Sequence, residues 1–270
     1  MNDNIGFIGG GRMAEALIQG IIKAGLFGPE QIMAADPDLG RRQALSSQYG
    51  INTFAQATDF IGNCTTLMLA VKPQVMGPVL DSIKLAINAG HLLISIAAGI
   101  SVNFMEGRLS GCQCRLVRVM PNTPVLVLEG ASALSPGNLA TDEDMAKARA
   151  IFDAVGRTVV LPENYLDAVT GLSGSGPAYV FSFIEALIDG GVKVGLNRAD
   201  AQLLVLQTVL GSVKLAMASN EHPAQLRAMV TSPGGTTIAG LHELARAGFS
   251  GIIMDAVEAA TLRSKELGQG

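Results

Sequence analysis

The stretch Ile5-Gly6-Phe7-Ile8-Gly9-Gly10-Gly11-Arg12-Met13-Ala14 decides the fold of the first half of this 270-residue chain. A short apolar run ends in the pattern Gly9-x-Gly11-x-x-Ala14, and an apolar-periodic stretch typical of a helix follows. Gly9 permits a tight turn, Gly11 lets the backbone approach a pyrophosphate, and the small Ala14 lets the helix pack on the strand. Free N–H groups at the helix start favour phosphate. This context predicts a dinucleotide site rather than a glycine-rich turn without a ligand.

The composition predicts an oligomer. Hydrophobic residues make up 49% of the chain and charged residues 16%. This is apolar for a soluble monomer, and excess apolar surface usually marks a subunit interface or a ligand groove. The net charge of −4, with no long basic run, argues against nucleic acid as a partner.

The same features predict a cytoplasmic protein without a membrane span. A strand is expected almost at the N-terminus, which leaves no room for a signal peptide. The longest apolar candidate, 91–100, is too short to cross a bilayer. Cys64, Cys112 and Cys114 form an odd set with no second ligand pair, so we expect reduced thiols and no metal site.

The chain shows two successive patterns of predicted secondary structure. Up to about residue 160, short apolar runs alternate with helical patterns, which predicts a doubly wound, mainly parallel sheet. The expected strands are 5–8, 32–35, 67–71, 92–96, 116–120, 131–134 and 158–161, and the expected helices between them include 11–24, 41–49, 74–86 and 142–154. Long helical segments then follow at 177–189, 198–218, 236–247 and 250–267. We therefore expect an α/β Rossmann domain over 1–161 and an all-α domain over 162–270.

Four expected strand ends carry small residues. They are Ala35-Asp36-Pro37, Ala70-Val71-Lys72-Pro73, Ile96-Ala97-Ala98-Gly99 and Val119-Met120-Pro121-Asn122-Thr123-Pro124. Ligands of open α/β sheets bind beyond the carboxyl ends of the strands, and a flat nicotinamide and its ribose can lie against small residues there. The shared pattern favours cofactor contacts over the plainer interpretation of Lys72 as a solvated residue beside a strand-ending proline.

Asp36 bears on the choice of cofactor. It lies 22 residues after Ala14, where an acid usually accepts hydrogen bonds from the ribose hydroxyls of NAD. Its carboxylate would repel a 2′-phosphate, but Arg41 and Arg42 follow closely and offer to bind one. The sequence leaves NADH and NADPH both open.

Two glycine-rich loops precede helices in the second half. Gly171-Leu172-Ser173-Gly174-Ser175-Gly176-Pro177 leads into one helix, and Thr231-Ser232-Pro233-Gly234-Gly235-Thr236-Thr237 into another. Such turns at helix starts bind carboxylates or phosphates, although each alone is also ordinary capping chemistry. Beside a dinucleotide fold, the pair predicts a substrate site.

The set 6–14, 70–73, 95–99, 120–124, 167–179 and 231–237 closely resembles pyrroline-5-carboxylate reductases, along the whole chain and in the right order. The resemblance implies a Rossmann domain and a helical dimerisation and substrate domain, with an active site shared between two subunits. It also implies NADPH- or NADH-dependent reduction of the imine 1-pyrroline-5-carboxylate to L-proline. We accordingly expect a homodimer or a higher assembly of dimers.

The resemblance and the loops together suggest roles for individual residues. Thr237, with the amides around Gly235 and Thr236, is expected to hold the substrate carboxylate, and Glu163 to lie near the ring nitrogen. The expected substrate contacts are Ser175, Ser232, Gly234, Gly235, Thr236 and Thr237. The expected cofactor contacts are Ile8, Gly9, Gly10, Gly11, Arg12, Met13, Asp36, Ala70, Val71, Lys72, Pro73, Ala97, Ala98, Gly99 and Asn122. Arg12 departs from the family, which more often has Asn or Gln there, and Asp36 departs from its hydroxyl or Arg.

Two alternatives stay open. One is a β-hydroxyacid dehydrogenase, whose motif Gly171, Gly174 and Gly176 match, although Val180 and Phe183 replace its Lys and Asn. The other is a non-catalytic dinucleotide sensor, against which the intact loops of the second half speak.

Overall fold

The computed structural model describes residues 3–268, which form two compact units. The first runs as far as Ser175 and takes in the C-terminal stretch from Ala259, and the second is Gly176–Glu258. The predicted division into domains 1–161 and 162–270 marks the point where strands give way to helices. The compact units are defined by contacts instead and divide the chain at other residues, so the predicted division stays a prediction.

An eight-stranded sheet forms the centre of the first unit, in the order β3-β2-β1-β4-β5-β6-β7-β8. Its strands are β1 (Ile5–Ile8), β2 (Ile32–Ala35), β3 (Asn52–Phe54), β4 (Thr66–Leu69), β5 (Leu92–Ser95), β6 (Arg115–Met120), β7 (Gly130–Pro136) and β8 (Gly156–Val160). All neighbouring strands are parallel except β6 and β7. The expected doubly wound, mainly parallel sheet is confirmed. The edge strand β3 was not predicted, because it has three residues and two of them are polar.

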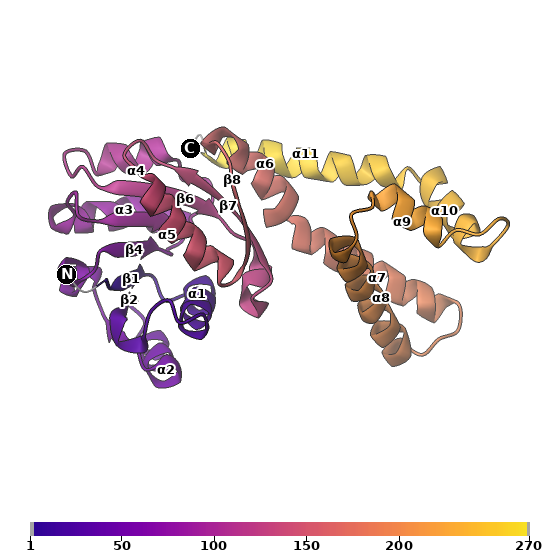
Figure 1. Cartoon of the computed structure of the whole chain (residues 1–270), viewed down its shortest axis with the longest axis horizontal. Helices are drawn as coiled ribbons and strands as arrows, with labels where there is room; N and C mark the ends of the chain where they lie inside the picture. The colour runs from indigo at the N-terminus through magenta and orange to yellow at the C-terminus, as the bar shows by residue number, and fades with distance from the viewer. Residues whose placement is uncertain (1–2, 269–270) are drawn as a thin grey trace. The chain divides into compact units, whose positions relative to one another are not determined.

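Helices cover both faces of this sheet (Figure 1). They are α1 (Arg12–Lys23), α2 (Leu39–Tyr49), α3 (Pro73–Ile83), α4 (Val102–Arg108) and α5 (Asp142–Asp153). Buried side chains of α1, α2 and α5 join one apolar cluster, and those of α3 and α4 join the other. Successive residues of each strand point to opposite faces, so Ile5 and Phe7 of β1 lie in the first cluster and Ile8 in the second.

The remaining elements are helical. They are α6 (Leu166–Val169), a π-helical turn (Thr170–Gly174), α7 (Gly176–Lys193), α8 (Arg198–Ala218), α9 (Pro223–Met229), α10 (Thr236–Arg246) and α11 (Phe249–Gly268). The expected loop at 171–176 is therefore largely a wide helical turn. Asn197 caps α8 through its side chain, as its residue type predicts. Ser250 is the second residue of α11, and α7 continues through Gly190 and Gly191 to Lys193.

The second unit buries almost nothing by itself. Between Gly176 and Glu258, a range that the structure describes throughout, Ala201 alone is buried. Helix α8 carries Leu203, Leu206, Leu210, Val213 and Met217 at alternating steps of three and four residues, and all five are exposed. By length and composition α8 could cross a membrane, so the expectation that no apolar segment is long enough is wrong for this helix.

Candidate functional site

The glycine loop after β1 has the shape that a dinucleotide needs. Gly9 has a φ of +102°, and a Cβ there would lie 2.6 Å from the carbonyl oxygen of Ala70. Gly11 is the N-cap of α1, and a Cβ built on it meets no atom within 4 Å. No side chain of the N-cap position accepts a hydrogen bond from the first-turn amides of α1. Gly9 serves the turn itself, and the space at Gly11 fits a pyrophosphate.

The residues around this loop contribute in different ways. Ile8 is buried in one apolar cluster, and Met13 packs against the other. The side chain of Ile8 is therefore taken up by the core, whereas that of Met13 is half-buried. Arg12 is exposed on the first turn of α1, where its charge suits a phosphate.

Asp36 follows β2 and is tied to the glycine loop. Its Oδ2 accepts a hydrogen bond from the amide of Gly10 at 2.8 Å, and its Oδ1 accepts one from the amide of Asp38 at 2.9 Å. Arg41 reaches the same loop, donating to the carbonyl oxygen of Gly10 from Nε at 2.9 Å and from Nη2 at 2.6 Å. The backbone of Gly10 is thus fixed on both sides by residues of the second strand and helix.

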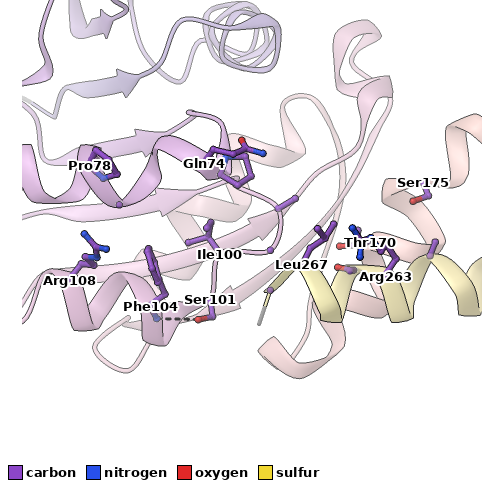
Figure 2. A pocket seen from close by; sticks show the side chains of 17 residues that line it. Gln74, Pro78, Ile100, Ser101, Phe104, Arg108, Thr170, Ser175, Arg263 and Leu267 are labelled. Atoms are coloured by element: carbon purple, nitrogen blue, oxygen red, sulfur yellow. Dashed lines mark hydrogen bonds between the residues drawn. The ribbon is translucent and has the colours of Figure 1, made fainter. Parts of the chain in front are cut away.

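A cavity of about 700 Å³ lies in the first unit, and the predicted residues Pro73, Ala98, Gly99 and Ser175 line it. Pro73 begins α3, after Lys72 at the exposed N-cap, and Gly99 turns with a φ of +73°. Figure 2 shows Ile100, Ser101 and Phe104 of the β5–α4 segment, with Arg263 and Leu267 of α11. The structure therefore joins the ends of β4 and β5 to the π-helical turn around one space.

The contribution of α11 to this cavity was not predicted. Arg263, Ser264 and Leu267 come from the C-terminal end of the chain, and Ser264 donates to Oδ1 of Asp167 at 2.7 Å. Local periodicity indicates that this segment is a helix. It gives no signal that the helix returns to the first unit.

Glu163 and Asn122 hold the segments around the cavity. Oε1 of Glu163 accepts from the amide of Val102 at 2.7 Å and from Nη1 of Arg118 at 2.8 Å. Asn122 donates to the carbonyl oxygen of Ser173 at 3.0 Å and accepts from the amide of Ala131 at 2.8 Å. Glu163, in a short turn after β8, thus connects that turn to α4 and β6, and Asn122 connects the segment after β6 to β7 and to the π-helical turn. Their predicted contacts with substrate and cofactor stay predictions.

Arg118 is a charged residue that the sequence did not single out. It lies in β6, in the middle of an apolar run, and its side chain is 9% exposed. A charge this deep requires a partner, and Glu163 supplies it. A charged residue inside an expected buried strand was the available signal.

The second glycine-rich loop prepares the start of α10. Gly234 has a φ of +64°, and Gly235 is the N-cap of the helix, without a capping side chain. Ser232, Gly234 and Thr236 are exposed, and Thr237 is half-buried. The residues predicted for the substrate carboxylate thus lie together around free amides at a helix N-terminus, the arrangement that binds small anions. This loop belongs to the second unit, whereas Ser175 and the predicted cofactor residues belong to the first.

The thiols are free, as predicted. Cys64, Cys112 and Cys114 form no disulfide. Burial raises the pKa of the Cys64 thiol to about 12, and burial also raises that of Cys114 to about 11, with a smaller contribution from Cys112. Within residues 3–268, no group of three or more His, Cys, Asp and Glu side chains gathers as metal ligands would.

Substitutions at two glycines separate binding from folding. We expect Gly11→Ala to weaken NADH and NADPH binding at least about tenfold, because its methyl group enters the open space at α1, while stability falls by less than about 1 kcal/mol. Gly9→Ala should instead reduce the free energy of unfolding by about 2 kcal/mol or more, since a positive φ and a backbone contact oppose the methyl group. Nucleotide fluorescence titration and urea unfolding measure the two effects. Unchanged nucleotide affinity in Gly11→Ala would contradict this placement of the site.

Comparison with known proteins supplies the family. Residues 163–267 match the model "Pyrroline-5-carboxylate reductase dimerisation", and residues 4–99 match "NADP oxidoreductase coenzyme F420-dependent". A pyrroline-5-carboxylate reductase of Methanosarcina acetivorans is 47% identical over 99% of both chains, and one of Arabidopsis thaliana is 45% identical over 98% of this chain and 95% of its own.

Solved structures agree with these relatives. A pyrroline-5-carboxylate reductase from Coxiella burnetii has a TM-score of 0.94 at 34% identity and covers 99% of both chains. One from Plasmodium falciparum with NADP bound has a TM-score of 0.88 at 36% identity, over 99% of this chain and 98% of its own. The chain belongs to the pyrroline-5-carboxylate reductase family.

Proposed function

We propose that this chain reduces the C=N bond of 1-pyrroline-5-carboxylate to give L-proline, with NADPH or NADH as the reductant. The observation that carries the proposal is the presence of two prepared anion sites in a chain that is similar along its length to reductases of this name. One site is the start of α1 and the other is the start of α10. A cofactor pyrophosphate and a substrate carboxylate are the anions that this reaction requires.

The first unit would hold the cofactor. Gly9, Gly10 and Gly11 would hold the pyrophosphate with the first-turn amides of α1, and Asp36 would lie beside the adenosine ribose. Ala70–Pro73, Ala97–Gly99 and Asn122 lie at or after the carboxyl ends of β4, β5 and β6, where a nicotinamide would lie. When bound, the cofactor supplies a hydride for the imine carbon.

The loop 231–237 would fix the substrate. Its free amides would bind the carboxylate, and Ser232 and Thr237 would add hydroxyl donors. An iminium carbon is already electrophilic, so the protein must position the ring and present one face more than it must supply strong acid. Solvent can deliver the proton to the nitrogen, and Glu163 is our candidate for stabilising the resulting cation. At Val180 and Phe183, α7 lacks the Lys and Asn that a β-hydroxyacid dehydrogenase uses.

The assay that tests this function follows nicotinamide absorbance with protein, NADPH or NADH, and 1-pyrroline-5-carboxylate. We expect oxidation of NADPH or NADH when the imine is supplied. With a β-hydroxyacid and NADP+ or NAD+ instead, we expect no reduction of the cofactor. Cofactor binding without turnover would favour the sensor. Turnover restricted to hydroxy acids would favour the dehydrogenase.

Thr237 provides a residue-level test. Thr237→Ala should raise the Michaelis constant for the imine about tenfold or more, because a bound carboxylate loses a hydroxyl donor. Thr237→Ser retains the hydroxyl and serves as the matched control, with a Michaelis constant near that of the parent. Equal kinetics for all three proteins would remove Thr237 from the site.

A comparison of two substitutions separates the structural and catalytic parts of Glu163. Glu163→Ala leaves the buried Arg118 without its carboxylate and should lower the free energy of unfolding by about 3 kcal/mol. Glu163→Gln keeps an acceptor for the amide of Val102 and should lose less stability. If Glu163 also stabilises the substrate cation, kcat should fall in Glu163→Gln at temperatures where that protein is fully folded. Unchanged kcat there would restrict Glu163 to a structural role.

We propose that the second unit completes itself against a second copy of the chain. The apolar stripe of α8 defined by Leu203, Leu206, Leu210, Val213 and Met217 is exposed, and residues 163–267 match a dimerisation model. Burial of each such side chain stabilises association by about 1.5–3 kcal/mol, a gain that a symmetric dimer receives twice. A dimer interface therefore accounts for the membrane-like composition of α8.

The three free cysteines suit the reducing cytoplasm, where we place the enzyme.

The dimer proposal predicts the effect of charges on that stripe. The double substitution Leu203→Glu and Leu210→Glu should convert the protein to monomers at micromolar concentration, because it places carboxylates in the interface. Gln202→Glu adds charge on the same helix without removing apolar surface and is the control. Light scattering coupled to size exclusion measures the mass, and an undiminished mass in the double variant would contradict the interface.

A further inference from the structure

We infer that this chain prefers NADH to NADPH and that Asp36 sets the preference. The inference rests on the proposed function only in taking the glycine loop as the nucleotide site. It goes beyond that function because the reaction itself requires only a hydride.

The carboxylate of Asp36 is fixed where the adenosine ribose would lie. One oxygen accepts from the amide of Gly10 and the other from the amide of Asp38. Each carboxylate oxygen can accept two hydrogen bonds, so acceptor capacity remains for both ribose hydroxyls. A 2′-phosphate at that place would bring up to two negative charges close to the carboxylate, and this repulsion disfavours NADPH.

Arg41, the first cation that could offset this repulsion, is already engaged. Its guanidinium donates twice to the carbonyl oxygen of Gly10, and Nη2 also donates to Oε2 of Glu15 at 2.8 Å. If Arg41 turned toward a phosphate, it would leave both acceptors without these donors. Tyr49 lies on the same network, since its hydroxyl donates to Oε1 of Glu15 at 3.4 Å.

Arg42 and the start of α2 are also committed. Nη1 of Arg42 donates to the carbonyl oxygens of Asp36 and Pro37, at 2.7 and 3.0 Å. Asp38 caps α2, and its Oδ1 accepts from the amides of Gly40 and Arg41, at 2.7 and 3.3 Å. A carboxylate of the protein thus occupies the helix N-terminus that a 2′-phosphate would otherwise use.

Together these contacts disfavour a 2′-phosphate beside the ribose. Two arginines and one helix N-terminus could bind a phosphate here, and each already serves an acceptor of the chain itself. Two carboxylates, those of Asp36 and Asp38, lie among them. NADH meets a fixed acceptor at Asp36, whereas NADPH must displace internal hydrogen bonds and approach two negative charges.

The test measures binding as well as turnover. Titration of nicotinamide fluorescence gives the Kd of NADH and of NADPH, and steady-state assays with 1-pyrroline-5-carboxylate give kcat/KM for each. We expect NADH to bind at least about tenfold more tightly than NADPH, with a similar ratio in kcat/KM. Asp36→Asn should reduce the ratio of the Kd of NADPH to the Kd of NADH to about one third of its value in the parent protein, or less. The substitution removes the negative charge of the side chain and keeps its size.

Asp38→Asn is the matched control. Asn is a good N-cap, so α2 is retained while one neighbouring charge is lost. If the two substitutions change the ratio equally, diffuse charge sets the preference and the assignment to Asp36 is overturned. Tighter binding of NADPH by the parent protein overturns the inference outright. Nucleotide binding with the expected ratio but no imine reduction supports the inference and sinks the proposed function, and failure of both nucleotides to bind overturns both.

Discussion

The hydrogen bonds around the backbone of Gly10 are the constraint on which the nucleotide half of this protein depends. Its amide donates to Asp36 and its carbonyl oxygen accepts from Arg41. A glycine loop alone is flexible, because glycine has more conformations to lose than any other residue. Here side chains from the second strand and helix hold the loop from both sides. Its shape, and the space left free at Gly11, therefore do not depend on a bound ligand for their definition.

The same contacts explain why binding and selectivity are hard to separate. Residues that hold the loop are the residues that would meet the ribose, so a change of cofactor preference at Asp36 also disturbs the turn. Arg41 carries a second task in the same way, because its guanidinium connects α2 to α1 through Glu15. A site that uses its cations for internal structure has fewer of them to offer a phosphate.

Much of the first unit could be predicted from the sequence because the signals are local. The strand–glycine–helix pattern at β1 and α1, and the alternation of apolar runs with helices, are each contained in a few tens of residues. What could not be predicted depends on contacts distant in sequence. Arg118 meets Glu163 across 45 residues, and Ser264 meets Asp167 across 97. The local sequence pattern around Arg118 or Ser264 does not indicate which distant residue it will contact.

The second unit presents the opposite case. Its helices are clear from the local sequence pattern, but a single copy of the unit does not bury their apolar faces. The helices were expected and occur, yet between Gly176 and Glu258, all within the described part, Ala201 alone is buried. Helices with apolar stripes need a surface to cover them, since most helical stability comes from packing of the apolar face. Because α8 carries so many apolar side chains, it is also long and apolar enough to cross a membrane by length and composition. An interface helix and a membrane helix can share a composition, and the alternating stripe of α8 together with the dimerisation match favours a protein partner.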